Sequence, residues 1–134
     1  MINHSSSNIF RNSNRILLVD DEPDITFSFN MILEDNGFAV DSYNDPIEAL
    51  SSFKSGIYAI AVLDIRMPGM NGFELSLELR KADNNLKILF MTAYDIHDEG
   101  INQTKLKVLE EKPVILKKPI SVYDFVSKIK KELT

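Results

Sequence analysis

The chain has 134 residues, a formal net charge of −5 at pH 7 and no cysteine. This length fits a single domain, and 44% hydrophobic with 26% charged residues is ordinary for a globular fold. The absence of cysteine excludes disulfides, thiolate metal sites and a cysteine nucleophile, and it suits a reducing compartment. We therefore expect a cytoplasmic protein.

No apolar run approaches the roughly 20 residues that a membrane-spanning helix needs. No long basic run or nucleic-acid motif is present either, so we expect neither membrane insertion nor direct binding to nucleic acid. The first residues are polar and lack the apolar centre of a signal peptide. We predict a disordered polar arm over residues 1–13 and one domain over residues 14–134.

The first strand is predicted at Ile16–Val19, a continuous apolar run that is closed by the acids Asp20–Glu22. Continuous rather than alternating apolarity is typical of a strand covered on both faces, as in a parallel sheet. Pro23 suits the first turn of a helix, which we expect to end at Asn36–Gly37.

A second strand is predicted at Phe38–Tyr43, and its mixed polarity indicates the edge of a sheet. Either Asn44 or Asp45 can cap the helix that follows. We expect Phe53 to lie inside this helix and Ser55–Gly56 to stop it.

The most hydrophobic strand is predicted at Tyr58–Leu63, and it leads directly into Asp64. The Pro68–Gly69 pair then marks a turn. The segment Phe73–Arg80 alternates apolar and polar residues, which formally favours a strand. Its Leu, Glu and Arg residues favour a helix instead, and parallel strands on both sides require a crossover, so we predict a helix.

Another buried strand is predicted at Leu86–Thr92. The region 96–111 has loose periodicity, and we expect one short or irregular helix there. A last strand is predicted at Val114–Lys117, followed by a helix that Ser121 caps and that carries an apolar stripe up to Leu133.

Strands that alternate with helices in this way predict a (βα)₅ α/β fold with one parallel sheet and helices on both faces. Right-handed crossovers leave few topologies. Among these we choose the flavodoxin-like, doubly wound strand order 2-1-3-4-5, because the first and third strands then flank the point where ligands bind.

Polar side chains follow the strands at one edge of this sheet: Asp20 and Asp21, Asp64, Thr92 and Lys118. Three neighbouring carboxylates repel one another, and a divalent cation removes that conflict. An all-oxygen donor set suits Mg²⁺ or Mn²⁺. A cation, a hydroxyl and a lysine around one carboxylate indicate a phosphoryl site in which Asp64 is the nucleophile.

Four short motifs lie in this order along the chain: Val19–Pro23, Leu63–Gly72, Met91–Ala93 and Lys118–Pro119. Together they resemble the response-regulator receiver domains (CheY-like) of two-component signalling, and the resemblance runs from about Arg15 to Leu133. It implies a signalling switch of a phosphorelay, which accepts a phosphoryl group from a histidine kinase or a phosphotransfer protein. It also implies a downstream effector protein, and no enzymatic activity beyond the domain's own phosphoryl transfer and dephosphorylation.

The resemblance assigns a role to each residue at the strand ends. Asp64 matches the phospho-acceptor, and Thr92 and Lys118 match the hydroxyl and the lysine that contact the phosphoryl group. Asp21, Asp64 and the backbone carbonyl of Arg66 match the Mg²⁺ ligands, with Asp20 acting through water. The Lys118–Pro119 peptide bond is expected to be cis.

Two departures concern the readout of such a switch. Ile115 stands where the family usually has an aromatic residue, and the stretch from Tyr94 to Pro113 is longer and more irregular than is typical. A binding module without phosphorylation control therefore stays open as an alternative. We expect Arg66 and Tyr94, each two residues beyond a site residue, to set the dephosphorylation rate.

Simpler interpretations exist for each residue alone. Asp20 and Asp21 could be solvated charges at a helix start, Asp64 could cap a turn, and Lys118 could be an exposed lysine.

Two other classes of phosphate-handling protein fit the sequence less well. A haloacid-dehalogenase-like phosphatase needs an acid where Arg66 stands, and a flavodoxin needs a Ser/Thr/Gly-rich loop after the first strand. The sequence leaves open whether the domain stands alone or is part of a longer protein.

Overall fold

The computed structural model describes residues 13–95 and 102–134. Residues 1–12 of the predicted arm and residues 96–101 of the predicted irregular region lie outside the described part of the chain. The arm and the proposed domain boundary therefore stay predictions.

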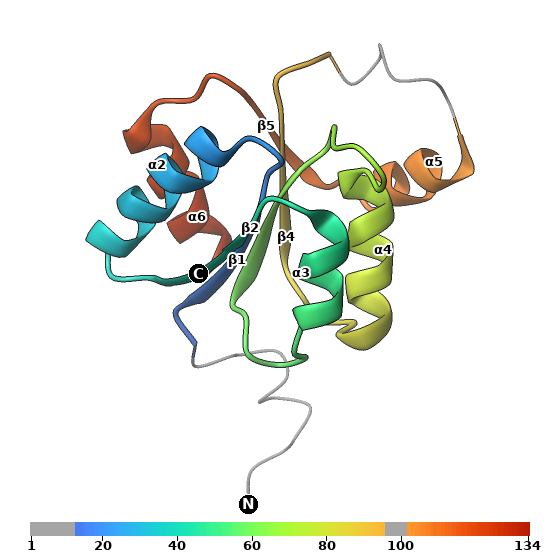
Figure 1. The fold of residues 1–134 in the computed structure, drawn as a ribbon, viewed down its shortest axis with the longest axis horizontal. Helices are drawn as coiled ribbons and strands as arrows, with labels where there is room; N and C mark the ends of the chain where they lie inside the picture. Colours follow the sequence, from blue (N-terminus) through green and yellow to red (C-terminus); the bar gives the residue numbers. More distant parts are fainter. Residues whose placement is uncertain (1–12, 96–101) are drawn as a thin grey trace, which may run out of the picture.

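Five parallel strands form one sheet in the order β2-β1-β3-β4-β5, as predicted (Figure 1). Their bounds are β1 (Arg15–Val19), β2 (Ala39–Tyr43), β3 (Ile60–Asp64), β4 (Ile88–Thr92) and β5 (Val114–Lys117). The flavodoxin-like fold is thus confirmed, with β2 at an edge and β1 beside β3 in the middle.

Helices cover both faces of the sheet. Their bounds are α2 (Pro23–Asp35), α3 (Pro46–Ser52), α4 (Gly72–Ala82), α5 (Gln103–Glu110) and α6 (Val122–Glu132). Figure 1 shows α2 and α6 on one face and α3 and α4 on the other, and α5 packs against α4. None of the helices in the described part of the chain is long and apolar enough to span a bilayer.

The central strands bury both of their faces. Alternate side chains of a strand point to opposite faces, so Leu17 and Val19 enter the core under α3 and α4, while Ile16 and Leu18 enter the core under α2 and α6. All four are fully buried. Full burial of one such side chain is worth about 1.5–3 kcal/mol, which makes the middle of the sheet a rigid base for the groups at its edge.

The alternating segment after the Pro-Gly turn is helical, as predicted. Asn71 and Glu74 form a capping box, in which the Asn71 side chain accepts from the Glu74 N–H and the Glu74 carboxylate accepts from the Asn71 N–H. Because α4 lies between α3 and α5, it buries a wide arc. Leu77 is half-buried against the core. The apolar residues of α4 therefore cover a wider part of the helix surface than the narrow stripe of a helix with one buried side.

Some predicted boundaries were wrong by a few residues. β3 and β4 begin at Ile60 and Ile88 rather than at Tyr58 and Leu86. Phe53 was expected inside α3, but it is the C-cap, with φ −65° and ψ 136°. Its ring stacks on the Tyr58 ring at a centroid distance of 5.7 Å, and this contact favours an extended backbone over another helical turn. Asp45 is the N-cap of α3 and accepts from the Ile47 N–H.

Candidate functional site

Three carboxylates meet at the carboxyl ends of β1 and β3. Asp20 and Asp21 follow β1, Asp64 ends β3, and the two strands are direct neighbours. One carboxylate oxygen from each of the three residues lies within 4.8 Å of the other two. Asp20 is fully buried and Asp64 is 4% exposed, so this is a built cluster rather than a solvated surface charge.

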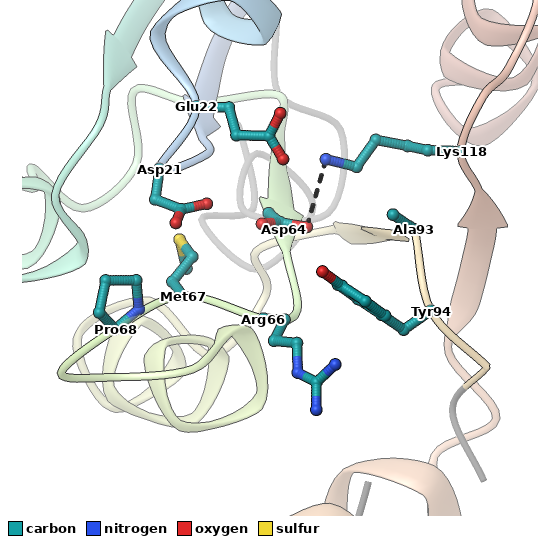
Figure 2. Close-up of a pocket in the computed structure, with 9 residues that line it drawn as sticks. All are labelled: Asp21, Glu22, Asp64, Arg66, Met67, Pro68, Ala93, Tyr94 and Lys118. Carbon is teal, nitrogen blue, oxygen red and sulfur yellow. Dashed lines mark ion pairs between the residues drawn. The ribbon is translucent and has the colours of Figure 1, made fainter. Parts of the chain in front are cut away.

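Lys118 brings a positive charge to the cluster from the end of β5. Its Nζ lies 2.9 Å from Asp20 Oδ2. It also lies 3.5 Å from Asp64 Oδ1, an ion pair that Figure 2 shows. Its backbone N–H donates to the Thr92 carbonyl at 2.7 Å. The Lys118–Pro119 bond is cis, as the resemblance implied, and the neighbouring Lys117 is exposed.

The electrostatics of the cluster disfavour a third negative charge. Burial and the charge of Asp20 raise the pKa of Asp64 to about 7, although Lys118 opposes this. Burial alone would lower the pKa of Lys118, but the hydrogen bond and charge of Asp20 raise it overall. Three convergent carboxylate oxygens with incomplete charge compensation fit a hard divalent cation.

The cluster opens into a pocket of about 360 Å³. The residues that line it come from the ends of β1, β3, β4 and β5: Asp21, Glu22, Asp64, Arg66, Met67, Pro68, Ala93, Tyr94 and Lys118. Figure 2 shows Asp64 in the middle, with the Asp21 carboxylate on one side and the Lys118 ammonium on the other. The pocket is open enough to admit a phosphoryl group.

Arg66 and Tyr94 meet at one side of this pocket. The Arg66 guanidinium carbon lies 4.2 Å from the centroid of the Tyr94 ring, a cation–π contact. Both residues were singled out from the sequence, but nothing in their spacing predicted that they touch. Their contact forms a wall beside Asp64 (Figure 2).

Thr92 is only 4% exposed and is not among the residues that line the pocket. The next two residues, Ala93 and Tyr94, do line it. The Thr92 hydroxyl accepts from the Tyr94 N–H at 3.1 Å and lies 3.3 Å from the Tyr94 carbonyl oxygen, to which it donates. The structure therefore places Thr92 next to the site with its hydroxyl engaged by the backbone of the β4–α5 loop.

Several residues of the pocket were not predicted as site residues. Glu22 lines the wall above Asp64, and its backbone N–H donates to Asp20 Oδ1 at 3.0 Å. Met67 and Ala93 supply apolar surface. All three lie within the motifs that follow β1, β3 and β4. Their position in those motifs could have predicted that they line the pocket.

Gly72 fixes how closely α4 approaches the end of β3. Its N–H donates to the Ile65 carbonyl at 2.7 Å. A Cβ at this position would clash with the Asp64 carbonyl oxygen and would lie 2.9 Å from the Ile65 Cα. The residue must therefore be a glycine for Asp64 to keep its place.

The profile of the response regulator receiver domain family matches residues 16–130 of the chain. The chain belongs to this family. This receiver domain is 43% identical over 79 residues to the transcriptional regulatory protein TctD of Salmonella typhimurium, a match that covers 59% of the chain and 35% of TctD. The chain thus spans about a third of the length of that relative.

Solved structures agree with the family. The receiver domain is similar to the response regulator protein TrrA of Thermotoga maritima, crystallised in complex with Mg²⁺ and BeF, with 34% identity and a TM-score of 0.74 over 90% of this chain and 99% of that one. TrrA in complex with the histidine kinase ThkA matches at 33% identity, with the same TM-score and coverage. A receiver domain protein from Methanospirillum hungatei matches at 28% identity, with a TM-score of 0.77 over 91% of this chain and 94% of that one.

Proposed function

We propose that this receiver domain is a phosphorylation-activated switch that accepts a phosphoryl group on Asp64 in a Mg²⁺-dependent reaction. The observation that carries the proposal is the buried cluster of Asp20, Asp21 and Asp64 with Lys118 beside it. Phosphoryl transfer depends mainly on positioning and charge neutralisation. Both are supplied here by groups on rigid strand ends.

Asp21, Asp64 and the backbone carbonyl of Arg66 would hold Mg²⁺, with Asp20 acting through water. When bound, the cation neutralises the carboxylates and the phosphoryl oxygens. Mn²⁺ offers the same coordination chemistry. The similarity to TrrA, which was crystallised in complex with Mg²⁺ and BeF, supports Mg²⁺.

In the transfer step an Asp64 carboxylate oxygen forms the new bond to phosphorus, and the bond between phosphorus and the donor breaks with its electron pair going to the donor. Asp64 must be ionised to attack. Burial and the charge of Asp20 raise the pKa of Asp64 to about 7, so the fraction of Asp64 that carries a proton near neutral pH would have to release it before the attack. Lys118 would neutralise one phosphoryl oxygen. Thr92 would donate a hydrogen bond from its hydroxyl to another, in place of the bond that it donates to the Tyr94 carbonyl.

The partners follow from the same proposal. The phosphoryl donor would be a sensor histidine kinase or a phosphotransfer protein, as the TrrA–ThkA complex supports. The output would reach a downstream effector protein through protein contacts. The domain would be a signalling module, without enzymatic turnover beyond its own phosphorylation and dephosphorylation. The cytoplasmic location stays a prediction.

Intact-mass measurement after incubation with Mg²⁺ and acetyl phosphate tests the proposal. We expect the wild-type chain to gain the mass of one phosphoryl group, and Asp64→Asn to gain none. Asp24→Asn is a matched control, because Asp24 is an exposed carboxylate in the first turn of α2, and it should gain mass as the wild type does. A phosphoryl gain in Asp64→Asn, or none in the wild type, would falsify the proposal.

A second candidate function is a binding module that does not respond to phosphorylation. Ile115 favours it, because this aliphatic residue stands where the family usually has an aromatic residue and is half-buried against the core under α3 and α4. This candidate predicts the same partner affinity for the phosphorylated and the unphosphorylated domain. A change in affinity on phosphorylation would reject it.

A further inference from the structure

Asn44 lies outside the acid cluster but is bonded to it. It follows the edge strand β2, and its side-chain Nδ2 donates two hydrogen bonds. One goes to the Asp20 backbone carbonyl at 2.9 Å, and the other goes to Thr26 Oγ1 at 2.9 Å. One amide nitrogen thus connects the loop after β1 with the first turns of α2.

Thr26 completes this connection. It is only 5% exposed, and its hydroxyl donates to the Pro23 carbonyl at 3.0 Å. Because a hydroxyl has a single proton, Oγ1 can only accept from Asn44. Both groups facing the Asn44 amide are therefore acceptors, so its orientation is decided: the reverse orientation would place Oδ1 against them.

The described contacts restrain each polar group of Asp20. Its N–H donates to the Tyr43 carbonyl at 3.1 Å, Oδ1 accepts from the Glu22 N–H, and Oδ2 accepts from Lys118. These three bonds hold the start of the loop and the carboxylate. The carbonyl belongs to the peptide plane that leads into Asp21, and it is this group that Asn44 holds.

We propose that Asn44 is a positioning residue that sets the direction of the Asp20–Asp21 peptide plane and thereby places the Asp21 carboxylate for Mg²⁺ binding. The inference rests on the proposed function, in which Asp21 is a direct ligand. Residues behind the ligands of a metal site orient those ligands, and their loss typically costs about 10- to 100-fold in metal affinity. Asn44 acts on a backbone carbonyl at the edge of the site. We therefore expect its loss to lower the Mg²⁺ affinity by about tenfold, the lower end of that range.

The first experiment compares Mg²⁺ affinity by isothermal titration calorimetry in the wild type and Asn44→Ala. We expect Kd to rise about tenfold. We also expect the maximal phosphorylation rate from acetyl phosphate to recover at saturating Mg²⁺. A raised Kd with an unchanged maximal rate indicates that Asn44 places a ligand. General damage to the fold would lower the maximal rate as well.

Amide hydrogen exchange in the metal-free protein gives a second readout. The Glu22 N–H bond to Asp20 Oδ1 depends on the loop that Asn44 holds. We expect the Glu22 amide to exchange faster in Asn44→Ala, while the amides in the middle of β3 are unchanged.

Thr26 and Asn36 supply the companion variants. Thr26→Val removes the second acceptor and should weaken Mg²⁺ binding, whereas Thr26→Ser keeps a hydroxyl and should restore most of the affinity. Asn36→Ala is the matched control, because its Nδ2 also donates to a backbone carbonyl, that of Ile32 at 2.8 Å, at the far end of α2. It should bind Mg²⁺ as the wild type does.

The outcomes are distinct. An unchanged Kd in both Asn44→Ala and Thr26→Val, or an equal loss in Asn36→Ala, would overturn the positioning role. A wild type that neither binds Mg²⁺ nor gains a phosphoryl group would instead contradict the proposed function. Should Asn44→Ala fail to fold, the Thr26→Val and Thr26→Ser pair decides alone.

Discussion

At the scale of single residues, the ionised form of Asp64 works against the stability of the metal-free fold. The pKa of Asp64 is raised from 3.8 to about 7. Between about pH 4 and pH 7 the folded protein therefore holds a proton that the unfolded chain has released, so the free energy of unfolding falls as the pH rises through this window. The full cost, roughly 4 kcal/mol at most, is present above pH 7.

Asp64→Asn is therefore expected to stabilise the metal-free protein, and the gain should grow from near zero at about pH 4 to its largest value at about pH 8. Urea unfolding in the presence of a chelator, repeated across this pH range, measures the gain. The control is Asp24→Asn, which replaces an exposed carboxylate in the first turn of α2. A gain that does not vary with pH would contradict the electrostatic explanation.

The contact between Arg66 and Tyr94 leads to a prediction about the lifetime of the phosphorylated state. The stacked side chains form one wall of the pocket beside Asp64, and a wall there limits the approach of water. Arg66→Ala combined with Tyr94→Ala should shorten the lifetime by roughly fivefold, about 1 kcal/mol of barrier. The decay of the phosphorylated mass after removal of the donor measures it.

Tyr123→Ala is the control for that variant, because Tyr123 is 78% exposed and does not line the pocket. Its phosphorylated form should decay at the wild-type rate. An unchanged lifetime in the double variant would show that the wall does not govern access of water.

At the scale of elements, the junction between β3 and α4 holds Asp64 in place. Gly72→Ala would force a Cβ onto the backbone of Asp64 and Ile65, and the helix start must then move away from the strand end. We expect a loss of at least about 2 kcal/mol in stability, together with a large loss in the phosphorylation rate. Chemical unfolding and intact-mass time courses measure the two effects.

Gly56→Ala separates this close approach from ordinary backbone strain. Gly56 has φ +86° and open space around its Cβ position, so the substitution should cost about 1 kcal/mol through conformation alone. Its phosphorylation rate should stay that of the wild type. Equal effects of the two substitutions on phosphorylation would disprove the proposed role of Gly72.

Helices α4 and α3 show what the sequence could and could not predict about the elements. The segment after the Pro-Gly turn alternates like a strand, yet residue preference and the need for a crossover predicted α4 correctly. The end of α3 was placed too late, because the contact between the Phe53 and Tyr58 rings depends on residues that only the folded chain brings together. Local patterns identify elements better than they identify where elements end.

At the scale of the whole molecule, the sheet order and the meeting of Asp20, Asp21, Asp64 and Lys118 could be predicted, because parallel strands bring their carboxyl ends to one edge. The side-chain bonds could not. Nothing in the sequence shows that the Thr92 hydroxyl is bonded to the Tyr94 backbone or that the Arg66 side chain stacks on the Tyr94 ring. Such contacts depend on rotamers and on loops, which sequence periodicity does not describe.

The ion pair between Asp20 and Lys118 joins residues that are 98 positions apart in the chain. During vectorial synthesis Asp20 leaves the ribosome long before Lys118, so an unfinished chain lacks the lysine that balances the charge of Asp20 in the folded protein. A chain cut after Pro113 should consequently gain no phosphoryl mass. Phosphorylation of Asp64 thus becomes possible only when β5 has joined the sheet. A chain whose synthesis is incomplete therefore cannot enter the phosphorylated state.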